Sequence, residues 1–402
     1  MDKHARSRLV AVMTLSLVPA RAFAADAVSL SEAVETAARL DPVLTALSAR
    51  REAANDRRLS TLAPAEPNLI VTKDFDGAVE FGAAQALGFP GKARAAAKVV
   101  DAEAGGIEAQ AARRRAELAT RVKKSYASLW TARKKREVVA LKRASWQDIL
   151  KAAKRRAVKD TTTEVEYLNS QVVAAQIEDD DTSLSAEERS RLAELDLLLG
   201  RRADEPLELR EPAVPAYPPK LDRAALASAA ARSGPSLAEA RSDEEIARRR
   251  LAVAHSAYLP DFQFSAQRSE RAQTKLDAAV TFPVWSWFAE RRAARAARGE
   301  LAARGSDRSE AERALALDIE RRVAGLEAMG SKLQNHSERL LPLSERSFKV
   351  ALANYGYGKV DYNALSAAAS GWFGAQDGYY TLLEGYAASW AELEALIGGP
   401  LP

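Results

Sequence analysis

Residue types that could carry chemistry are scarce in this chain of 402 residues. It has no cysteine, and its three histidines, His4, His255 and His336, do not show the spacing of metal ligands. No Gly-rich phosphate loop, G-x-S-x-G turn or metal triad occurs, and the Asp and Glu residues lie in segments with the composition of solvated helices. We therefore expect no catalytic residues, no bound metal and no cofactor, and the protein is not predicted to be an enzyme.

The N-terminus has the pattern of a secretory signal. A basic segment precedes an apolar core over residues 9–18, and Ala22-Phe23-Ala24 is an A-x-A cleavage site. The apolar core has about ten residues, which is too short for a helix that spans a bilayer. Removal of residues 1–24 lowers the formal charge from +4 to about +1, so the composition gives little support to a nucleic-acid partner.

The mature chain repeats itself at an offset of about 193 residues, which indicates a structural duplication. The matching dipeptides are Asp41-Pro42 with Gly234-Pro235, Phe89-Pro90 with Phe282-Pro283 and, at an offset of about 198, Leu199-Gly200 with Ile397-Gly398. We therefore predict two structural repeats, residues 25–200 and residues 221–402. The Pro-rich segment 201–220 between them has no helix or strand pattern and is expected to be a linker.

Each half is predicted to contain a very long helix, a turn and a return helix of roughly 40 residues. Between 91 and 159 there is no proline, strong helix formers dominate, and the length at 1.5 Å per residue is roughly 100 Å. The second long helix is expected to kink or to be locally interrupted at Pro342, which cannot donate a backbone hydrogen bond. A seven-residue apolar repeat typical of coiled coils occurs at Val139, Trp146, Leu150, Ala153 and Ala157, and again at Ile319, Val323, Leu326, Gly330 and Leu333.

A pair of β-strands is predicted between the first helical segment and the long helix of each half. The predicted strands are Asn68–Phe75 and Val79–Phe89, around the turn Asp76-Gly77, and Asp261–Arg268 and Leu276–Trp285. Their length of eight to eleven residues suits tilted transmembrane strands. Because strands in a bilayer must close into a barrel, and four strands are too few, several chains would have to share one barrel, and three chains would make twelve strands.

Aromatic residues gather beside the ends of these strands, at Phe89, Trp285, Trp287 and Phe288. Such a group is typical of the interface between membrane and water. The alternative is a small buried core between the hairpins and the helices.

The chain resembles the outer-membrane efflux proteins of the TolC family over essentially its whole mature length. The most specific match is the stretch Leu340–Arg346, followed by Tyr355–Asp361, which is similar to the family's LP-x-A-E stretch and the start of its return helix. The repeat endings at Gly200 and Gly398 resemble those of the family as well. Residues 87–94 are similar to a Pro-Gly-Lys stretch common in the heavy-metal efflux branch.

The resemblance implies a mainly α fold with a small β part. Duplicated long helical hairpins would form an α-barrel, and four strands per chain would join a trimeric, 12-stranded outer-membrane β-barrel. The implied function is the exit duct of a tripartite efflux or type I secretion system, located in the outer membrane and extending into the periplasm. The implied partners are two further copies of the chain, a periplasmic adaptor, an inner-membrane pump and outer-membrane lipid. The substrate, whether metal ion, drug or protein, and the class of pump are not specified.

The family narrows its tunnel with acidic residues at the start of the return helices. The matching positions are Glu166 and Asn169 in the first half, and Asn363 and Ser366 in the second. Only Glu166 is a carboxylate, and three copies would form an acidic ring that favours cations. Alternatively, Glu166 stabilises the helix N-terminus through the helix dipole.

The turns at the far ends of the hairpins are the expected docking sites for an adaptor. They contain Asp160, Thr161 and Thr162 in the first half, and Tyr357, Gly358 and Lys359 in the second. The alternative function is a soluble periplasmic coiled-coil adaptor or helical clamp. That alternative explains the helices and the signal, but not an amphipathic hairpin at the same place in each half.

Overall fold

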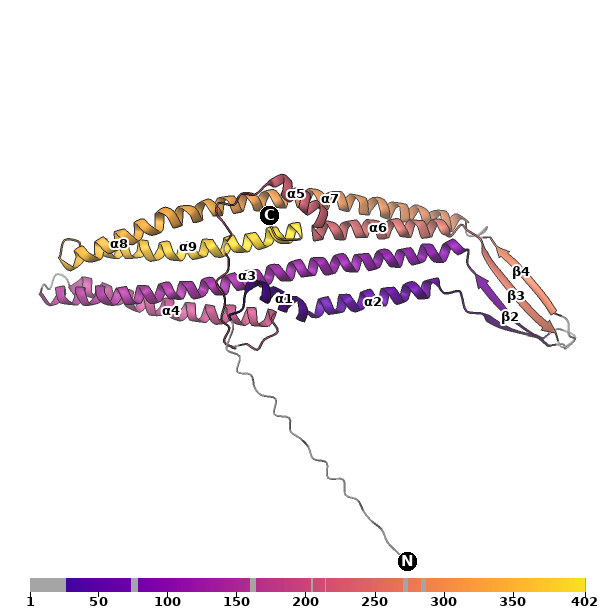
Figure 1. The fold of residues 1–402 in the computed structure, drawn as a ribbon, viewed down its shortest axis with the longest axis horizontal. Coiled ribbons are helices and arrows are strands. Elements are labelled where there is room, and N and C mark those ends of the chain that lie inside the picture. Colours follow the sequence, from indigo (N-terminus) through magenta and orange to yellow (C-terminus); the bar gives the residue numbers. More distant parts are fainter. Residues whose placement is uncertain are drawn as a thin grey trace, which may run out of the picture.

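The fold was analysed in a computed structural model. It describes residues 27–73, 79–159, 164–203, 205–213, 215–269, 274–282 and 287–401. The predicted signal segment and the Asp76-Gly77 turn lie outside the described residues. The molecule is elongated, with a β-sheet at one end and the turns between long helices at the other (Figure 1).

The two halves have the same order of helices and strands, except that the long outgoing helix of the second half is divided into three elements. The first half consists of α1 (Leu30–Leu40), α2 (Pro42–Leu62), β1 (Asn68–Lys73), β2 (Val79–Leu87), α3 (Pro90–Lys159) and α4 (Glu164–Leu198). The second consists of α5 (Arg223–Ser233), α6 (Pro235–Ser256), β3 (Asp261–Ser269), β4 (Thr274–Thr281), α7 (Trp287–Asn335), the π-helix η2 (His336–Leu340), α8 (Leu341–Gly356) and α9 (Tyr362–Ile397). No helix in the described part of the chain is both long and apolar enough to cross a membrane.

The helices form a layer about α3, which runs along most of the molecule (Figure 1). Toward the turns, α3 packs between α4 and α9, and α9 packs on α8. Toward the sheet, α3 packs between α2 and α6, and α6 packs on α7. The helices at the two sides of this layer are therefore α4 and α8 at one end, and α2 and α7 at the other.

The first helices of the first half are separated by a single residue, Asp41, which acts as an N-cap. Its side chain accepts a hydrogen bond from the Leu44 backbone N–H at 2.8 Å and forms an ion pair with Arg114 of α3 at 2.7 Å. Pro42 follows at the first position of α2, where a missing N–H costs nothing. The hydrogen bond from Arg114 is the main reason why the pKa of Asp41 is lowered.

The predicted seams of the long helices are buried. Val139, Trp146 and Ala153 of α3 belong to a core cluster that also contains Phe348 and Tyr355 of α8. The second set of seam positions, from Ile319 to Leu333, lies in another cluster with residues of α5 and α9. The prediction that these apolar repeats mark contacts between helices is confirmed.

The expected disturbance at Pro342 takes the form of a π-helical turn. Residues His336–Leu340 form this turn, and Pro342 is the second residue of α8. A proline ring inside a helix collides with the carbonyl group four residues earlier, and the wider π turn makes room for it. The long helix therefore continues through Pro342, with one π-helical turn between α7 and α8.

The four strands form a single antiparallel sheet in the order β1-β2-β3-β4. β2 ends at Leu87, two residues before the predicted end, because Pro90 begins α3. β4 begins at Thr274, earlier than the predicted Leu276, since its pairing with β3 extends to Arg268. Neither β1 nor β4 has a partner on its outer side among the described strands, so both edges of the sheet are open.

The linker crosses the helices as an extended strap, which we define as residues 206–219. Leu207 is buried among residues of α1, α3 and α4, and Leu209 forms a parallel bridge with Val28. At the other end, Pro218 and Pro219 lie against Gly330 of α7, where a side chain would collide with them. The strap therefore connects both halves at the middle of the molecule (Figure 1).

Candidate functional site

The sheet has one apolar and one polar face. Residues directly opposite each other in an antiparallel pair share a face, and alternate residues along a strand change face. From the observed register, the large apolar side chains of one face are Leu69, Val71, Val79, Phe81, Leu87, Phe262, Phe264, Leu276 and Val280, and the same face also carries Lys73, Gln85 and Arg268. Most of them are strongly exposed, with Leu69 at 86% and Leu276 at 78% of the accessible surface of a free residue. We call this surface the apolar face.

The opposite, polar face carries Glu80, Gln263, Ser265, Gln267, Lys275 and Asp277. The Lys275 ammonium group lies 2.9 Å from Glu80, and the Ser265 hydroxyl donates to Asp277 at 3.2 Å. The Lys275–Glu80 pair joins β4 to β2 on the face that also contains Gly82, where a Cβ would collide with the backbone and side chain of β3. A sheet that exposes hydrocarbon on one side and charge on the other can separate lipid from water.

Polar contacts fix the junction between sheet and helices. Asp261, at the start of β3, forms an ion pair with Lys92 in the first turn of α3 at 2.8 Å, and accepts from the Phe89 backbone N–H at 3.3 Å. Lys92 belongs to the Pro-Gly-Lys stretch, so this contact gives the stretch a structural role. Sequence reasoning missed the pairing because its partners are far apart in the chain.

Two of the predicted interfacial aromatics lie at helix starts near this junction, Phe89 just before α3 and Phe288 as the second residue of α7. Phe89 is half-buried and stacks on Phe262 with ring centroids 6.3 Å apart, whereas Phe288 is 77% exposed. Trp285 and the side chain of Trp287 lie outside the described part of the chain. An interfacial role for these residues stays a prediction.

At the other end of the molecule, three side chains from both hairpins meet in what we call the tip cluster: Arg156, Glu166 and Tyr355. The Tyr355 hydroxyl donates to the Glu166 carboxylate at 3.1 Å. The Arg156 guanidinium lies 4.7 Å from the centre of the Tyr355 ring and 3.9 Å from the same carboxylate. Glu166 is thus held by residues of its own chain.

Tyr355 is fully buried, and this burial raises the pKa of its hydroxyl to about 12, with a further contribution from the negative charge of Glu166. The hydroxyl therefore remains a hydrogen-bond donor at physiological pH. The tip cluster ties the return helix of the first half to the outgoing helix of the second. No local pattern in the sequence indicated the contact between Tyr355 and Glu166.

The other predicted constriction residues are more exposed. Asn169 and Asn363 are exposed, and Ser366 is half-buried in the second turn of α9. Among the described residues, no hydrogen bond joins any two of Glu166, Asn169, Asn363 and Ser366. A constriction would require the facing residues of other chains, so this role stays a prediction.

The second tip turn is well placed for contact with a partner. Tyr357 is 82% exposed, Gly358 has a φ of +72°, and the Lys359 backbone N–H donates to the Asn354 carbonyl at 3.0 Å. Asp361 then caps α9 by accepting from the Ala364 backbone N–H at 2.7 Å. Asp160, Thr161 and Thr162 of the first turn lie outside the described residues, and docking at either turn stays a prediction.

The described residues contain no group of three or more His, Cys, Asp or Glu side chains placed to hold a metal ion. No family model matches the sequence, and no curated protein matches it. Solved structures do match.

The outer-membrane channel OprN aligns with a TM-score of 0.77 at 16% identity, over 92% of this chain and 90% of that one. The outer membrane protein VceC from Vibrio cholerae aligns with a TM-score of 0.75 at 16% identity, over 93% and 97%. The open state of the MtrE outer membrane channel from Neisseria gonorrhoeae aligns with a TM-score of 0.74 at 14% identity, over 92% and 89%. The chain has the fold of these outer-membrane proteins. The mostly helical architecture with a four-stranded antiparallel sheet, expected from the TolC-family resemblance, is confirmed, whereas the heavy-metal branch remains a prediction.

Proposed function

We propose that the mature chain is an outer-membrane exit duct of a tripartite efflux or type I secretion system. Three copies form the duct, which carries substrates passively while an inner-membrane pump supplies the energy. Its sheets form a 12-stranded barrel in the outer membrane, and its helices extend into the periplasm.

The observation that carries this proposal is the division of the sheet into an apolar and a polar face. Leu69, Phe81 and Leu276 expose large apolar surfaces on the same side, where a soluble protein would expose few. Alternation between an outward apolar face and an inward polar face is the pattern of strands in an outer-membrane barrel. A soluble adaptor or clamp would leave this face in contact with water, so the alternative function has less support.

The open edges support assembly from several copies. β1 and β4 have unpaired outer sides, and a sheet in a bilayer must have none. The layer of helices is also open, at α4 and α8 near the turns and at α2 and α7 near the sheet. A rotational assembly in which β4 of one copy pairs with β1 of the next closes both layers at once.

The remaining assignments of the proposal concern the periplasmic end. Glu166 lies near the mouth of the duct, held by the tip cluster, and the adaptor docks on the turns that contain Asp160–Thr162 and Tyr357–Lys359. The exposed ring of Tyr357 and the charge of Lys359 give the second turn a surface that a protein partner can bind.

Two adjacent residues of β3 provide a test. Ala266 is on the apolar face and Ser265 on the polar face. Arginine on the lipid side costs about 2–4 kcal/mol near the bilayer midplane, whereas the water-filled side tolerates it. We expect Ala266→Arg to reduce the amount of protein assembled in the outer membrane severely, and Ser265→Arg to preserve assembly and change only single-channel conductance.

The native mass of the protein extracted from outer membranes with mild detergent is the accompanying measurement. Wild type and Ser265→Arg should give the mass of three chains. A monomer in the soluble periplasmic fraction, or equal behaviour of the two arginine variants, would contradict the proposed duct.

A further inference from the structure

Two cationic side chains lie on the apolar face of the sheet, both next to the turns of the hairpins. Lys73 is the last residue of β1 and pairs with Val79, the first residue of β2. Arg268 of β3 pairs with Thr274, the first residue of β4. Both cations are exposed, and among the described strand residues no acid shares this face with them. The hairpin end of the apolar face is therefore positively charged.

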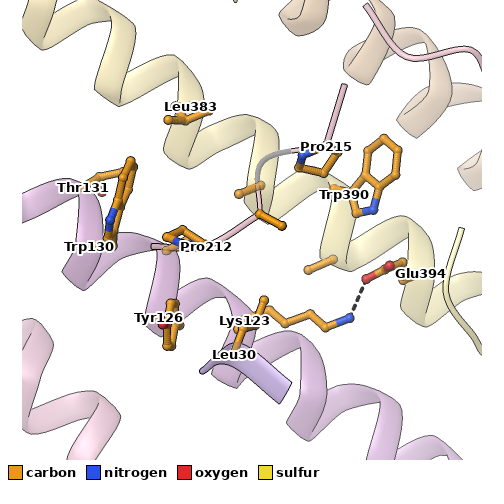
Figure 2. Close-up of a pocket in the computed structure, with 14 residues that line it drawn as sticks. Leu30, Lys123, Tyr126, Trp130, Thr131, Pro212, Pro215, Leu383, Trp390 and Glu394 are labelled. Atoms are coloured by element: carbon orange, nitrogen blue, oxygen red, sulfur yellow. Dashed lines mark hydrogen bonds and ion pairs between the residues drawn. The ribbon is translucent and has the colours of Figure 1, made fainter. Parts of the chain in front are cut away.

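Many other cations of the chain have acidic partners within it. On the polar face of the sheet, the Lys275 ammonium group lies 2.9 Å from Glu80. Between the two halves, Lys123 of α3 and Glu394 of α9 form an ion pair at 2.5 Å (Figure 2). In the described part of the chain, the two cations of the apolar face take part in no ion pair. Their charge is available to a group outside the chain.

The third polar residue of the apolar face, Gln85, is satisfied by the chain itself. Its side-chain amide donates to the carbonyl oxygens of Ala65 and Ala86. Gln85 lies near the helix end of β2, away from the two cations. A polar group within the hydrocarbon of a bilayer needs such internal partners, whereas a long side chain at the interface can use water and lipid headgroups. The two ends of the apolar face thus treat polar groups differently.

The position of the cations suits the edge of a membrane. β2 has nine residues, Val79–Leu87, which at about 3.4 Å per residue give roughly 30 Å along the strand. A tilt of about 45° reduces this length to roughly 20 Å across the bilayer, close to the roughly 25 Å height of the apolar band of a barrel. Because the helices of the proposed duct extend into the periplasm, its hairpin end lies at the outer surface. Lys73 and Arg268 then reach the headgroups of the outer leaflet.

Lys73 and Arg268 lie on the strands that flank β2, on the same side of the sheet. These strands are about 10 Å apart across β2, a separation that two long side chains can bridge around one phosphate. Arginine offers a planar fork of donors to phosphate oxygens, and lysine adds a compact charge. Beside them, Leu69, Phe81 and Leu276 expose hydrocarbon. Positive charge next to exposed hydrocarbon fits an anionic lipid better than a free phosphate ion.

We propose that Lys73 and Arg268 bind the phosphate group of an anionic lipid in the outer leaflet, with the acyl chains of the lipid along the exposed apolar side chains. Each chain carries one site, so a trimer binds three such lipids. The site rests on the proposed duct function, because only the barrel places this face against lipid. Its binding fixes the depth of the barrel in the membrane.

The test is a lipid titration of the full-length mature protein in mild detergent, observed by native mass spectrometry. The probe is lipid A, a glycolipid with two phosphate groups, and the comparison lipid is the same molecule after removal of both phosphates. Wild type should bind up to three molecules of lipid A per trimer and should not retain the dephosphorylated lipid at the same concentration. An excess of inorganic phosphate should not displace the bound lipid A.

Four variants examine the two cations. Lys73→Gln and Arg268→Gln should each weaken binding of lipid A by about fivefold, and the double variant by at least about tenfold, because each removes one attraction to the anionic headgroup. Arg268→Lys keeps the charge and should retain most of the affinity. Lys275→Gln is the matched control, since it removes the same charge from the polar face, and it should bind as wild type does. The trimer mass in each spectrum shows that assembly is intact.

Equal binding of lipid A by wild type and the double variant would overturn the proposal, because the cations would then serve only to reach water at the interface. Equal binding of the dephosphorylated lipid, displacement by inorganic phosphate, or equal weakening in Lys275→Gln would overturn it as well. The spectra also report the number of chains. Trimers that bind lipid A independently of the two cations contradict the lipid site alone, whereas a monomer contradicts the duct and the site together.

Discussion

The two halves of the chain differ most in their long outgoing helices. In the first half, α3 runs without interruption from Pro90 to Lys159. In the second, the corresponding run from Trp287 to Gly356 has the same span but is divided by the π-helical turn at His336–Leu340. The other matching helices are nearly equal in length, with 35 residues in α4 and 36 in α9.

The difference has a simple origin in the sequence. At an offset of about 197 residues, Pro342 corresponds to Ser145, which a regular helix accommodates. The two halves thus keep the same architecture, although the long helix is regular in the first half and contains a π-helical turn in the second. Helix kinks are found at prolines and π turns, so the outgoing helix of the second half contains a site of this kind that α3 lacks.

The N-caps of α2 and α6 show the same kind of divergence. Asp41 caps α2 with its side chain, whereas its counterpart Gly234 caps α6 without one. A Cβ at Gly234 would collide with the carbonyl oxygens of Ala230 and Leu396, because α5 and α9 approach closely there. The first half thus uses a charged side chain where the second uses close backbone packing.

The largest expected effect on stability is at the two glycines that end the repeats, where the same substitution should have different consequences. Both have a positive φ, +64° at Gly200 and +76° at Gly398. Gly398→Ala would place a Cβ against the Ser233 carbonyl and force the backbone to move, whereas Gly200→Ala meets only the flexible Leu40 side chain. We expect a loss of more than about 3 kcal/mol for Gly398→Ala and about 1–2 kcal/mol for Gly200→Ala, measured by thermal unfolding. Equal losses would show that the two ends are packed alike.

A second prediction exchanges the proline between the halves. Ser145→Pro should destabilise α3 by about 3 kcal/mol, because the regular helix there has no π turn to receive the ring. Pro342→Ala should instead slow amide hydrogen exchange around residues 336–341, as the helix regains a donor. Unchanged amide hydrogen exchange in α3 of the Ser145→Pro variant would contradict this prediction, because it would show that the regular helix accommodates the proline without loss of stability.

The smallest expected effect on stability is at the tip cluster. This cluster also distinguishes the halves, because the residue of the first half that corresponds to Tyr355, at an offset of about 197 residues, is the exposed Val158. Tyr355→Phe removes a hydrogen bond to a carboxylate and should cost about 1–2 kcal/mol. The affected region is the nearby tip turn, where faster hydrogen exchange would report local opening.

The pH dependence of this effect follows from the raised pKa. The pKa of Tyr355 is about 12, above its ordinary value of 10.0, so its contribution is complete below pH 10 and is lost as the pH rises through 12. The difference between wild type and Tyr355→Phe should therefore be constant near pH 8 and shrink between pH 10 and 12. The exposed Tyr357 provides the control, because Tyr357→Phe should change neither stability nor its pH dependence.

Much of the fold could be predicted because it depends on periodic patterns and on Pro or Gly positions. The seam at Val139 and Trp146 and the interruption at Pro342 are local signals, and the structure confirms both. The exact strand ends could not be predicted in the same way. The end of β2 at Leu87 and the start of β4 at Thr274 depend on which residues pair across the sheet.

The candidate site was only partly visible in the sequence. Glu166 was identified as a carboxylate at a helix start, but its partners Arg156 and Tyr355 lie on other helices, and Tyr355 is 189 residues away. The ion pair between Lys92 and Asp261 joins residues 169 positions apart for the same reason. No local pattern specifies such pairs, because they form only when both halves pack together.

The duplication, the long helices and the two amphipathic hairpins can be recognised in the amino-acid sequence, because periodicity and helix or strand propensity act over short distances along the chain. The pairing that joins the two hairpins into one sheet and the position of the strap across the helices become visible only in the folded molecule. These features arise from contacts between segments far apart in sequence, where burial and steric fit select one arrangement among many that the local patterns allow.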